Sequence, residues 1–305
     1  MSSKLKRASW FLFGLGCLIF FTILKLPREP IKDSLHTLIA DALAAQGANF
    51  SASEEDLSFF LLPSYDLKKV TLTLPPPADA ARVDQISISP RFLPLLMGRW
   101  GADIQIKEGP GKFKTSFSNR SNSLSASFQS DQFDLGRLGI LPLFAGIQGS
   151  SILEGDGSVS TDLQALNETD GTINLRLTKI SLEPQTIAGF ALPKLSVSEA
   201  LIQSTIQKGK AKLTAVKIGK PAGTGATGDD LTATITGEIT LGKTFEMSTL
   251  NVKAHFKFSE NILKSFMLLD VILGPGKQAD GSYAYMITGS VAQPNAQPWT
   301  PGGGN

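Results

Sequence analysis

The chain has 305 residues, of which 42% are hydrophobic and 18% are charged, and its 29 basic residues nearly balance its 27 acidic residues. This length is sufficient to bury a core in one large domain or two smaller ones. The near-neutral charge argues against nucleic-acid binding, and the single cysteine, Cys17, excludes an internal disulfide or a thiolate metal site in the rest of the chain.

An uncharged apolar segment extends from Ala8 to Leu24. As a helix it would reach roughly 26 Å, near the short limit for crossing a bilayer core. The sequence after it, Lys25 to Pro30, contains no small-residue cleavage site, so we predict an uncleaved transmembrane anchor rather than a signal peptide. Lipoprotein processing at Cys17 is disfavoured because apolar sequence continues past it. The predicted anchor residues are Ala8, Trp10, Phe11, Leu12, Phe13, Leu15, Leu18, Ile19, Phe20, Phe21, Ile23 and Leu24.

Basic residues flank this segment unevenly. Lys4, Lys6 and Arg7 precede it together with the amino terminus, whereas Lys25 and Arg28 follow it. The positive-inside rule therefore predicts a cytoplasmic N-terminus and an extracytoplasmic body. We assign residues 1–29 to a cytoplasmic tip and a transmembrane anchor.

Residues 30–47 have the pattern of a juxtamembrane amphipathic helix. Pro30 suits a first helical turn and Gly47 suits a helix end. We expect the apolar stripe to cap the end of a sheet; the alternative, a helix lying on the membrane surface, is disfavoured because Asp33 and Asp41 offset Lys32. The residues of the stripe are Ile31, Leu35, Leu38, Ile39, Ala42 and Leu43.

Residues 48–293 are predicted to form a curved, largely antiparallel β-sheet body. Apolar and polar residues alternate with period two, and tight turn signals separate these stretches, which favours antiparallel hairpins. The clearest alternating stretches are 86–88, 124–128, 173–177 and 252–258. The turn signals are Pro75 to Pro77, Gly109-Pro110-Gly111, Asp156-Gly157, Asp170-Gly171 and Asp280-Gly281.

Short helical pieces are expected to interrupt the sheet. Apolar residues recur at helical spacing from Pro90 to Gly98 and from Asn261 to Leu273, and the stretch from Phe133 to Ala145 is a third candidate. The segment 294–305 ends in Pro-Gly-Gly-Gly-Asn and is predicted to be a disordered tail. The predicted fold class is therefore mainly β, with an N-terminal transmembrane helix and a few short amphipathic helices.

No motif in the body indicates catalysis, a cofactor or a metal. Gly223 to Gly228 matches the letters of the dinucleotide fingerprint, but a strand pattern follows it where a helix is required. The two histidines, His36 and His255, are far apart in sequence and are interpreted as solvated surface residues. We expect Glu54-Glu55-Asp56, the densest acidic run, to mark a solvated turn. Because the chain has 27 acidic residues but only two histidines and one cysteine, a carboxylate hydrolase is the one enzymatic alternative left open.

The order of features resembles the type II secretion system protein N family, in the version found in spirochaetes and deltaproteobacteria. The resemblance lies in the N-terminal anchor and amphipathic helix, in Leu67 to Leu72 after Pro63, and in a strand followed by a helix from Ile86 to Arg99. It continues through the glycine-punctuated stretch from Gly149 to Ser160. It is strongest at the C-terminal end, where Asp280-Gly281-Ser282-Tyr283 leads to Ile287 through Pro294.

The resemblance implies a non-enzymatic protein of the bacterial inner membrane, with a periplasmic body and with partners in the machinery that exports folded proteins. It implies no cofactor and carries over no catalytic residue. The N-terminal half is also similar to AsmA-like proteins, whose curved β-sheets form lipid-lined grooves, so a lipid-binding or lipid-transfer groove is the main alternative. The 18 phenylalanines could serve either a closed core or such a groove.

Overall fold

The computed structural model describes residues 28–45, 47–58, 63–73, 81–91, 94, 98–120, 122–139, 147–162, 164–187, 190–221, 228–266 and 268–300. The predicted anchor, Ala8 to Leu24, lies outside these residues. Within the described part of the chain, no helix combines the length and the hydropathy that a bilayer crossing requires.

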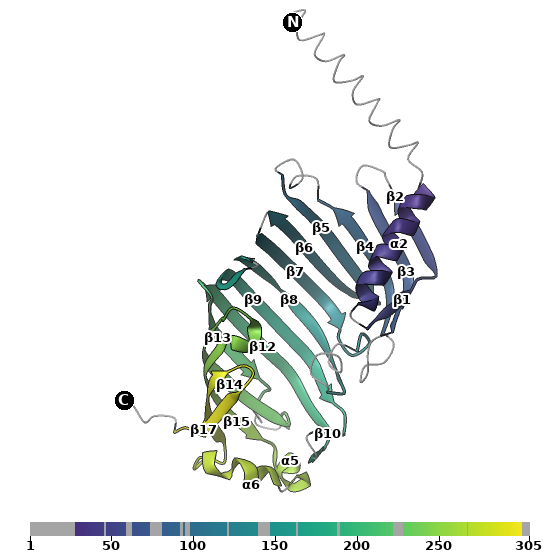
Figure 1. Cartoon of the computed structure of the whole chain (residues 1–305). Coiled ribbons are helices and arrows are strands. Elements are labelled where there is room, and N and C mark those ends of the chain that lie inside the picture. The colour runs from purple at the N-terminus through teal and green to yellow at the C-terminus, as the bar shows by residue number, and fades with distance from the viewer. Residues whose placement is uncertain are drawn as a thin grey trace, which may run out of the picture.

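Most of the described residues belong to one open antiparallel sheet of 15 strands (Figure 1). Its order is β1-β3-β4-β5-β6-β7-β8-β9-β12-β13-β14-β15-β16-β17, and β2 also pairs with β3. The strands are β1 (Asn49–Ser51), β2 (Glu54–Ser58), β3 (Ser64–Thr73), β4 (Ala81–Pro90), β5 (Trp100–Glu108), β6 (Gly111–Arg120), β7 (Ser123–Asp134), β8 (Gly149–Asp162), β9 (Ala165–Leu182), β12 (Leu195–Gln207), β13 (Lys210–Ile218), β14 (Leu231–Thr240), β15 (Thr249–Phe258), β16 (Tyr283–Ser290) and β17 (Pro294–Pro298).

Tight connections join most strands to their neighbours in sequence, which explains the up-and-down order. Glu108 pairs with Gly111 across Gly109 and Pro110, as the sequence predicts. At the β12–β13 connection, Lys208 and Gly209 both have positive φ, 48° and 70°, which matches the type I′ turn that suits the twist of a hairpin. β10 (Gln185–Ile187) and β11 (Phe190–Leu192) form a separate two-stranded hairpin, which lies between β9 and β12 in the chain.

A helix covers the N-terminal end of the sheet. α2 (Arg28–Ala44) is followed closely by Gly47, whose φ is +74°, and lies across the first strands (Figure 1). Ile31, Leu35 and Ile39 pack against the buried cluster, whereas Leu38 is 65% exposed, so the contacting stripe is narrower than predicted. The buried cluster consists of Leu57, Tyr65, Leu67, Val70, Ala81, Val83, Phe133, Leu135 and Leu138.

Short helices close the other end. α5 (Glu260–Ser265) and α6 (Leu268–Leu273) correspond to the predicted helical stretch, with α5 beginning one residue earlier, and Ser259 caps α5 by accepting a hydrogen bond from the amide of Ile262. The 3-10 turns η1 (Phe245–Met247) and η2 (Gly274–Gly276) precede β15 and β16. Figure 1 shows α6 at the end of the molecule opposite to the start of α2.

Two predicted turns are wrong. Asp156-Gly157 and Asp170-Gly171 lie inside the long strands β8 and β9. At Gly157, a Cβ atom would lie 2.5 Å from a ring carbon of Phe128, so glycine is required there by a neighbouring strand rather than by a turn. Asp280-Gly281, in contrast, is a true turn, and the φ of Gly281 is +77°.

The predicted solvated turn at Glu54 to Asp56 is also wrong, because these residues belong to edge strand β2. Glu55 accepts a hydrogen bond from the buried Tyr65 hydroxyl at 2.7 Å and pairs with His36 Nδ1 at 2.7 Å. Burial and this carboxylate both raise the pKa of Tyr65. Through these two contacts, Glu55 links His36 of α2 to Tyr65 of β3 and helps to hold the helix on the sheet.

The prediction of a disordered tail from residue 294 is wrong for its first part. Pro294–Pro298 form β17, which pairs with β16 although all five side chains are exposed. β17 is therefore held in place by main-chain hydrogen bonds and not by burial of its side chains. The amide of Trp299 continues this ladder by donating to the carbonyl oxygen of Ala284. Residues 301–305 lie outside the described part.

Two other predicted helical pieces are only partly described. Pro90 ends β4, and between it and Gly98 the structure describes only residues 91 and 94. The third prediction is wrong in its described part, because Phe133 and Asp134 end β7 and residues 135–139 form turns; residues 140–145 lie outside the described ranges.

We expect Leu67→Ala to lower the free energy of unfolding by about 2–5 kcal/mol, because Leu67 is 2% exposed and its truncation leaves a cavity. Leu38→Ala, on the exposed side of α2, is the matched control and should change it by less than about 0.5 kcal/mol. Urea unfolding measures both. Equal losses in the two variants would contradict the position of the core.

Candidate functional site

An unbroken row of paired residues crosses almost the whole sheet. Each member is the direct cross-strand partner of the next, so all lie on one face. Most are apolar, and the small residues Ser130 and Gly155 lie near the middle. From β3 to β16 the row is Leu67, Ile86, Ile106, Phe113, Ser130, Gly155, Leu175, Ile202, Val216, Ile235, Ala254 and Tyr285. We call the side of the sheet that carries this row the apolar face.

The middle of the apolar face is not closed by a second layer among the described residues. α2 covers its N-terminal end, and α5 and α6 lie at the C-terminal end (Figure 1). Between them, in β6 to β9, many apolar side chains are partly exposed instead of buried, including those of Phe117, Phe128, Val159, Ile173 and Leu175, whereas Val216 and Ala254 farther along the row are buried. This differs from a sandwich, in which two apolar faces would pack against each other.

The opposite face is polar and carries ion pairs. Arg176 Nη2 lies 2.9 Å from Glu199 Oε2, and Lys220 Nζ lies 3.3 Å from Glu199 Oε1. The hydrogen bonds from these two cations lower the pKa of Glu199. The sheet therefore separates a charged surface from an apolar one.

Two glycines on the apolar face bend the strands. Gly155 and Gly237 have φ values of 139° and 137°, and a Cβ atom on either would lie about 2 Å from a carbonyl oxygen of the next strand, 2.1 Å at Gly155 and 2.2 Å at Gly237. Register shifts occur beside both positions, in the β7–β8 and β13–β14 pairs. Glycine kinks and bulges give a sheet curvature. Figure 1 shows the result, with the C-terminal strands steeply inclined to the N-terminal ones.

An apolar pocket of about 160 Å³ lies where the apolar face meets the C-terminal helices. Leu182 and Leu195 are cross-strand partners in β9 and β12, and Phe258 ends β15. The lining residues are Leu182, Gln185, Pro193, Leu195, Phe258, Ile262 and Leu269.

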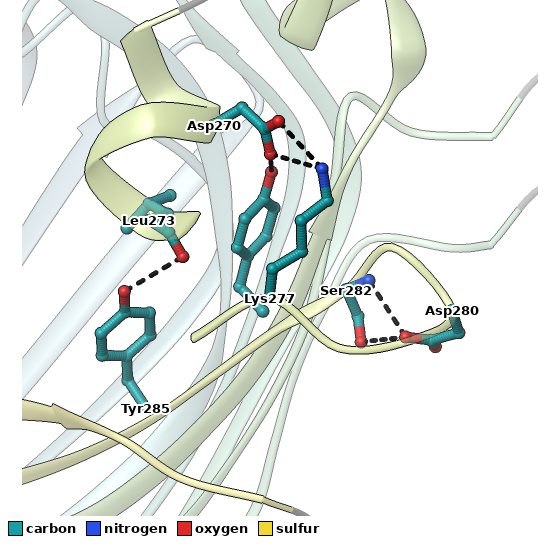
Figure 2. Close-up of polar contacts among 7 residues, drawn as sticks. Asp270, Leu273, Lys277, Asp280, Ser282 and Tyr285 are labelled. Carbon is teal, nitrogen blue, oxygen red and sulfur yellow. Dashed lines mark hydrogen bonds and ion pairs between the residues drawn. The ribbon is translucent and has the colours of Figure 1, made fainter. Parts of the chain in front are cut away.

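A charged network holds α6 to the end of the sheet (Figure 2). Lys277 Nζ donates to both carboxylate oxygens of Asp270, at 2.7 and 2.9 Å, and the Tyr283 hydroxyl donates to Oδ1 at 2.6 Å. The Tyr285 hydroxyl donates to the carbonyl oxygen of Leu273 at 3.1 Å. The hydrogen bonds from Lys277 and Tyr283 lower the pKa of Asp270, while burial and then Asp270 raise the pKa of Tyr283 to about 12.

Asp280, Ser282 and His255 form the arrangement that most resembles a catalytic site. His255 Nε2 lies 2.8 Å from Ser282 Oγ, and Ser282 donates to Asp280 Oδ1 from both its amide, at 3.0 Å, and its hydroxyl, at 2.5 Å. These two hydrogen bonds from Ser282 lower the pKa of Asp280.

The geometry of this group differs from that of a nucleophile activated by histidine. In a catalytic triad the histidine accepts the serine proton and the carboxylate orients the histidine. Here the Ser282 hydroxyl donates its hydrogen bond to the carboxylate and not to the histidine, and Ser282 is only 1% exposed. These contacts stabilise the Asp280-Gly281 turn, and His255 is a hydrogen-bonded residue rather than the solvated one we predicted.

The structure places few of the predicted site residues. The anchor residues from Ala8 to Leu24 and the orientation charges Lys4, Lys6 and Arg7 lie outside the described ranges. Residues 222–227 of the glycine-rich segment also lie outside, but β13 precedes that segment and β14 follows it, which is not the context of a dinucleotide site. In the part of the chain that the structure describes, no three histidine, cysteine or acidic side chains are grouped as metal ligands.

Sequence reasoning missed the pocket and the Asp270 network. The alternating patterns at 173–177 in β9 and 252–258 in β15 predicted strands with one apolar face, but only the strand order brings Leu182 and Phe258 together.

No protein-family model, no curated protein and no solved structure matches this chain.

We expect Asp270→Asn to lower the melting temperature at neutral pH, because the folded state favours the ionised carboxylate. A carboxyl group with a lowered pKa contributes stability above its unfolded pKa of about 4 and loses it as the pH falls through the lowered value. The difference between wild type and variant should therefore vanish in strong acid. Asp156→Asn, at an exposed position in β8, is the control and should leave the melting temperature unchanged at neutral pH. A constant difference at every pH would contradict this role of the Asp270 charge.

Proposed function

We propose that this chain is a non-enzymatic lipid-binding protein that holds acyl chains along the apolar face. The observation that carries the proposal is the row from Leu67 to Tyr285, which keeps apolar side chains on one face while the middle of that face has no second protein layer among the described residues. An exposed apolar patch that extends beyond a few hundred square ångströms is typical of an interaction surface.

The chemistry of the face suits hydrocarbon rather than a polar ligand. Each methylene group removed from water contributes about 0.8 kcal/mol, so a chain of about a dozen would contribute on the order of 10 kcal/mol. That is comparable with the association cost, on the order of 4–15 kcal/mol. Burial of the chain can therefore offset much of the association cost without a specific polar contact.

The predicted anchor supports a membrane setting for this activity. A transmembrane helix at Ala8 to Leu24 would keep the sheet close to a source of lipid. The orientation charges Lys4, Lys6 and Arg7 favour an extracytoplasmic body, and the resemblance to AsmA-like proteins agrees with a groove of this chemistry.

Adjacent residues of β12 provide a sharp test. Ile202 lies on the apolar face opposite Leu175 and Val216, whereas Leu201 lies on the other face opposite Arg176 and Lys217. We expect Ile202→Glu to reduce binding of a fluorescent fatty acid at least about tenfold, equivalent to about 1.4 kcal/mol, because it places a charge under the acyl chain. Leu201→Glu, the matched control, should leave binding nearly unchanged.

Circular dichroism of both variants would report whether the sheet is retained. If two folded variants bind the probe as the wild type does, or if the wild type binds no fatty acid, the proposal is wrong.

The sequence resemblance favours a second candidate, a structural and interaction component of the type II secretion machinery in the inner membrane. The segment that carries the strongest resemblance, Asp280 to Pro294, forms the Asp280-Gly281 turn, β16 and the start of β17. It includes Tyr283, which is fully buried. The resemblance therefore includes one buried part of the fold, Ser282 to Ala284.

Proximity labelling in living cells tests this candidate. With a biotin ligase fused to the C-terminus, we expect the labelled neighbours to be enriched in secretion components, because the body would lie among them in the periplasm. The same ligase fused to residues 1–29 alone is the control. Labelling confined to lipid-transport proteins, or indistinguishable from the control, would contradict a place in the secretion machinery.

A further inference from the structure

The apolar pocket at the C-terminal helices is continuous with the apolar face. Its floor is the cross-strand pair Leu182 and Leu195, and Phe258 pairs with Leu231 in the adjoining part of the sheet. Ile262 of α5 and Leu269 of α6 complete the wall. An acyl chain lying along the face toward this end would therefore meet the pocket.

Among the described residues that line the pocket, no polar side chain is free to bind a head group. Gln185 is the one polar side chain in its lining, and its amide is already paired. Gln185 Oε1 accepts a hydrogen bond from the amide of Gln148 at 2.7 Å, and Nε2 donates to the carbonyl oxygens of Gln148 at 3.0 Å and Glu183 at 3.1 Å.

The size of the pocket also fits an apolar group. Its volume is about 160 Å³. A protein cavity of about 150 Å³ lined by Leu, Ile and Phe stays dry and binds benzene or xenon. A group of that size corresponds to the last few carbons of an alkyl chain.

The wall of the pocket is held in place by the Asp270 network. Tyr283 and Lys277 fix Asp270, and Tyr285 fixes the carbonyl oxygen of Leu273, so both ends of α6 are tied to neighbouring elements (Figure 2). This arrangement directs Leu269 into the lining while Leu268 remains 51% exposed.

We infer that this pocket takes the methyl end of an acyl chain bound on the apolar face, which fixes the direction of the lipid with its head group away from α5 and α6. The inference rests on the proposed lipid-binding function and adds the orientation of the ligand.

Two photo-reactive fatty acids test this orientation in the full-length, membrane-anchored protein. One carries a diazirine at the methyl end of the chain, and the other carries it next to the carboxyl group. After irradiation, mass spectrometry maps the crosslinked peptides. We expect the methyl-end probe to label the pocket residues and the carboxyl-end probe to label the apolar face at a distance from them.

Leu269→Trp should reduce methyl-end labelling of the pocket several-fold, because the larger side chain fills the space. Leu268→Trp, on the exposed side of the same helix, is the matched control and should leave it unchanged. Continued labelling of the apolar face in Leu269→Trp would show that the variant still folds.

The outcomes separate this inference from the function on which it depends. Labelling of the apolar face by both probes without labelling of the pocket would overturn the inference alone, as would equal labelling of the pocket by both probes. The absence of labelling anywhere on the apolar face would overturn the lipid-binding function as well.

Discussion

The register of the main-chain ladder is the constraint on which the rest of the structure depends. Every neighbouring pair of strands is antiparallel, and each residue of the row from Leu67 to Tyr285 is held opposite the next. Because successive side chains point to opposite faces, a slip of one residue in any strand would move its apolar side chains to the charged face. A single apolar face, and the pocket at its end, therefore require the correct pairing of many strands at once.

Helices cover buried side chains at both ends of the sheet, and further buried side chains such as Val197 and Val216 lie in β12 and β13. The cluster around Leu67 lies beneath α2, and Tyr283 lies within the network that secures α6. This distribution explains how a sheet with an open middle remains ordered: the ends contain the well-packed contacts, and the ladder connects them. The two glycine kinks, at Gly155 and Gly237, curve the part of the sheet that lies between the helix-covered ends.

Local patterns in the sequence predicted the class of fold but not its long-range features. Alternation at 173–177 and 252–258 corresponds to β9 and β15, and helical spacing corresponds to α2. The Asp-Gly pair at 156 and 157 was wrongly predicted to be a turn. Glycine is needed at 157 because a larger side chain would collide with the ring of Phe128, and this neighbour is known only once the strands are paired. The pocket depends in the same way on strand order, since Leu182 and Phe258 are remote in sequence, and β17 was missed because its order comes from main-chain pairing alone.

The prolines of β17 have a consequence for the C-terminal edge of the sheet. Trp299 donates its amide inward to Ala284, so by alternation the amide positions of residues 294, 296 and 298 face outward. Two of these three are proline and have no N–H group, which leaves only Ala296 as an outward donor. A further strand, from another copy or from a misfolded chain, would find almost no donors there. The long sheet thus ends in a built-in barrier to edge-to-edge polymerisation.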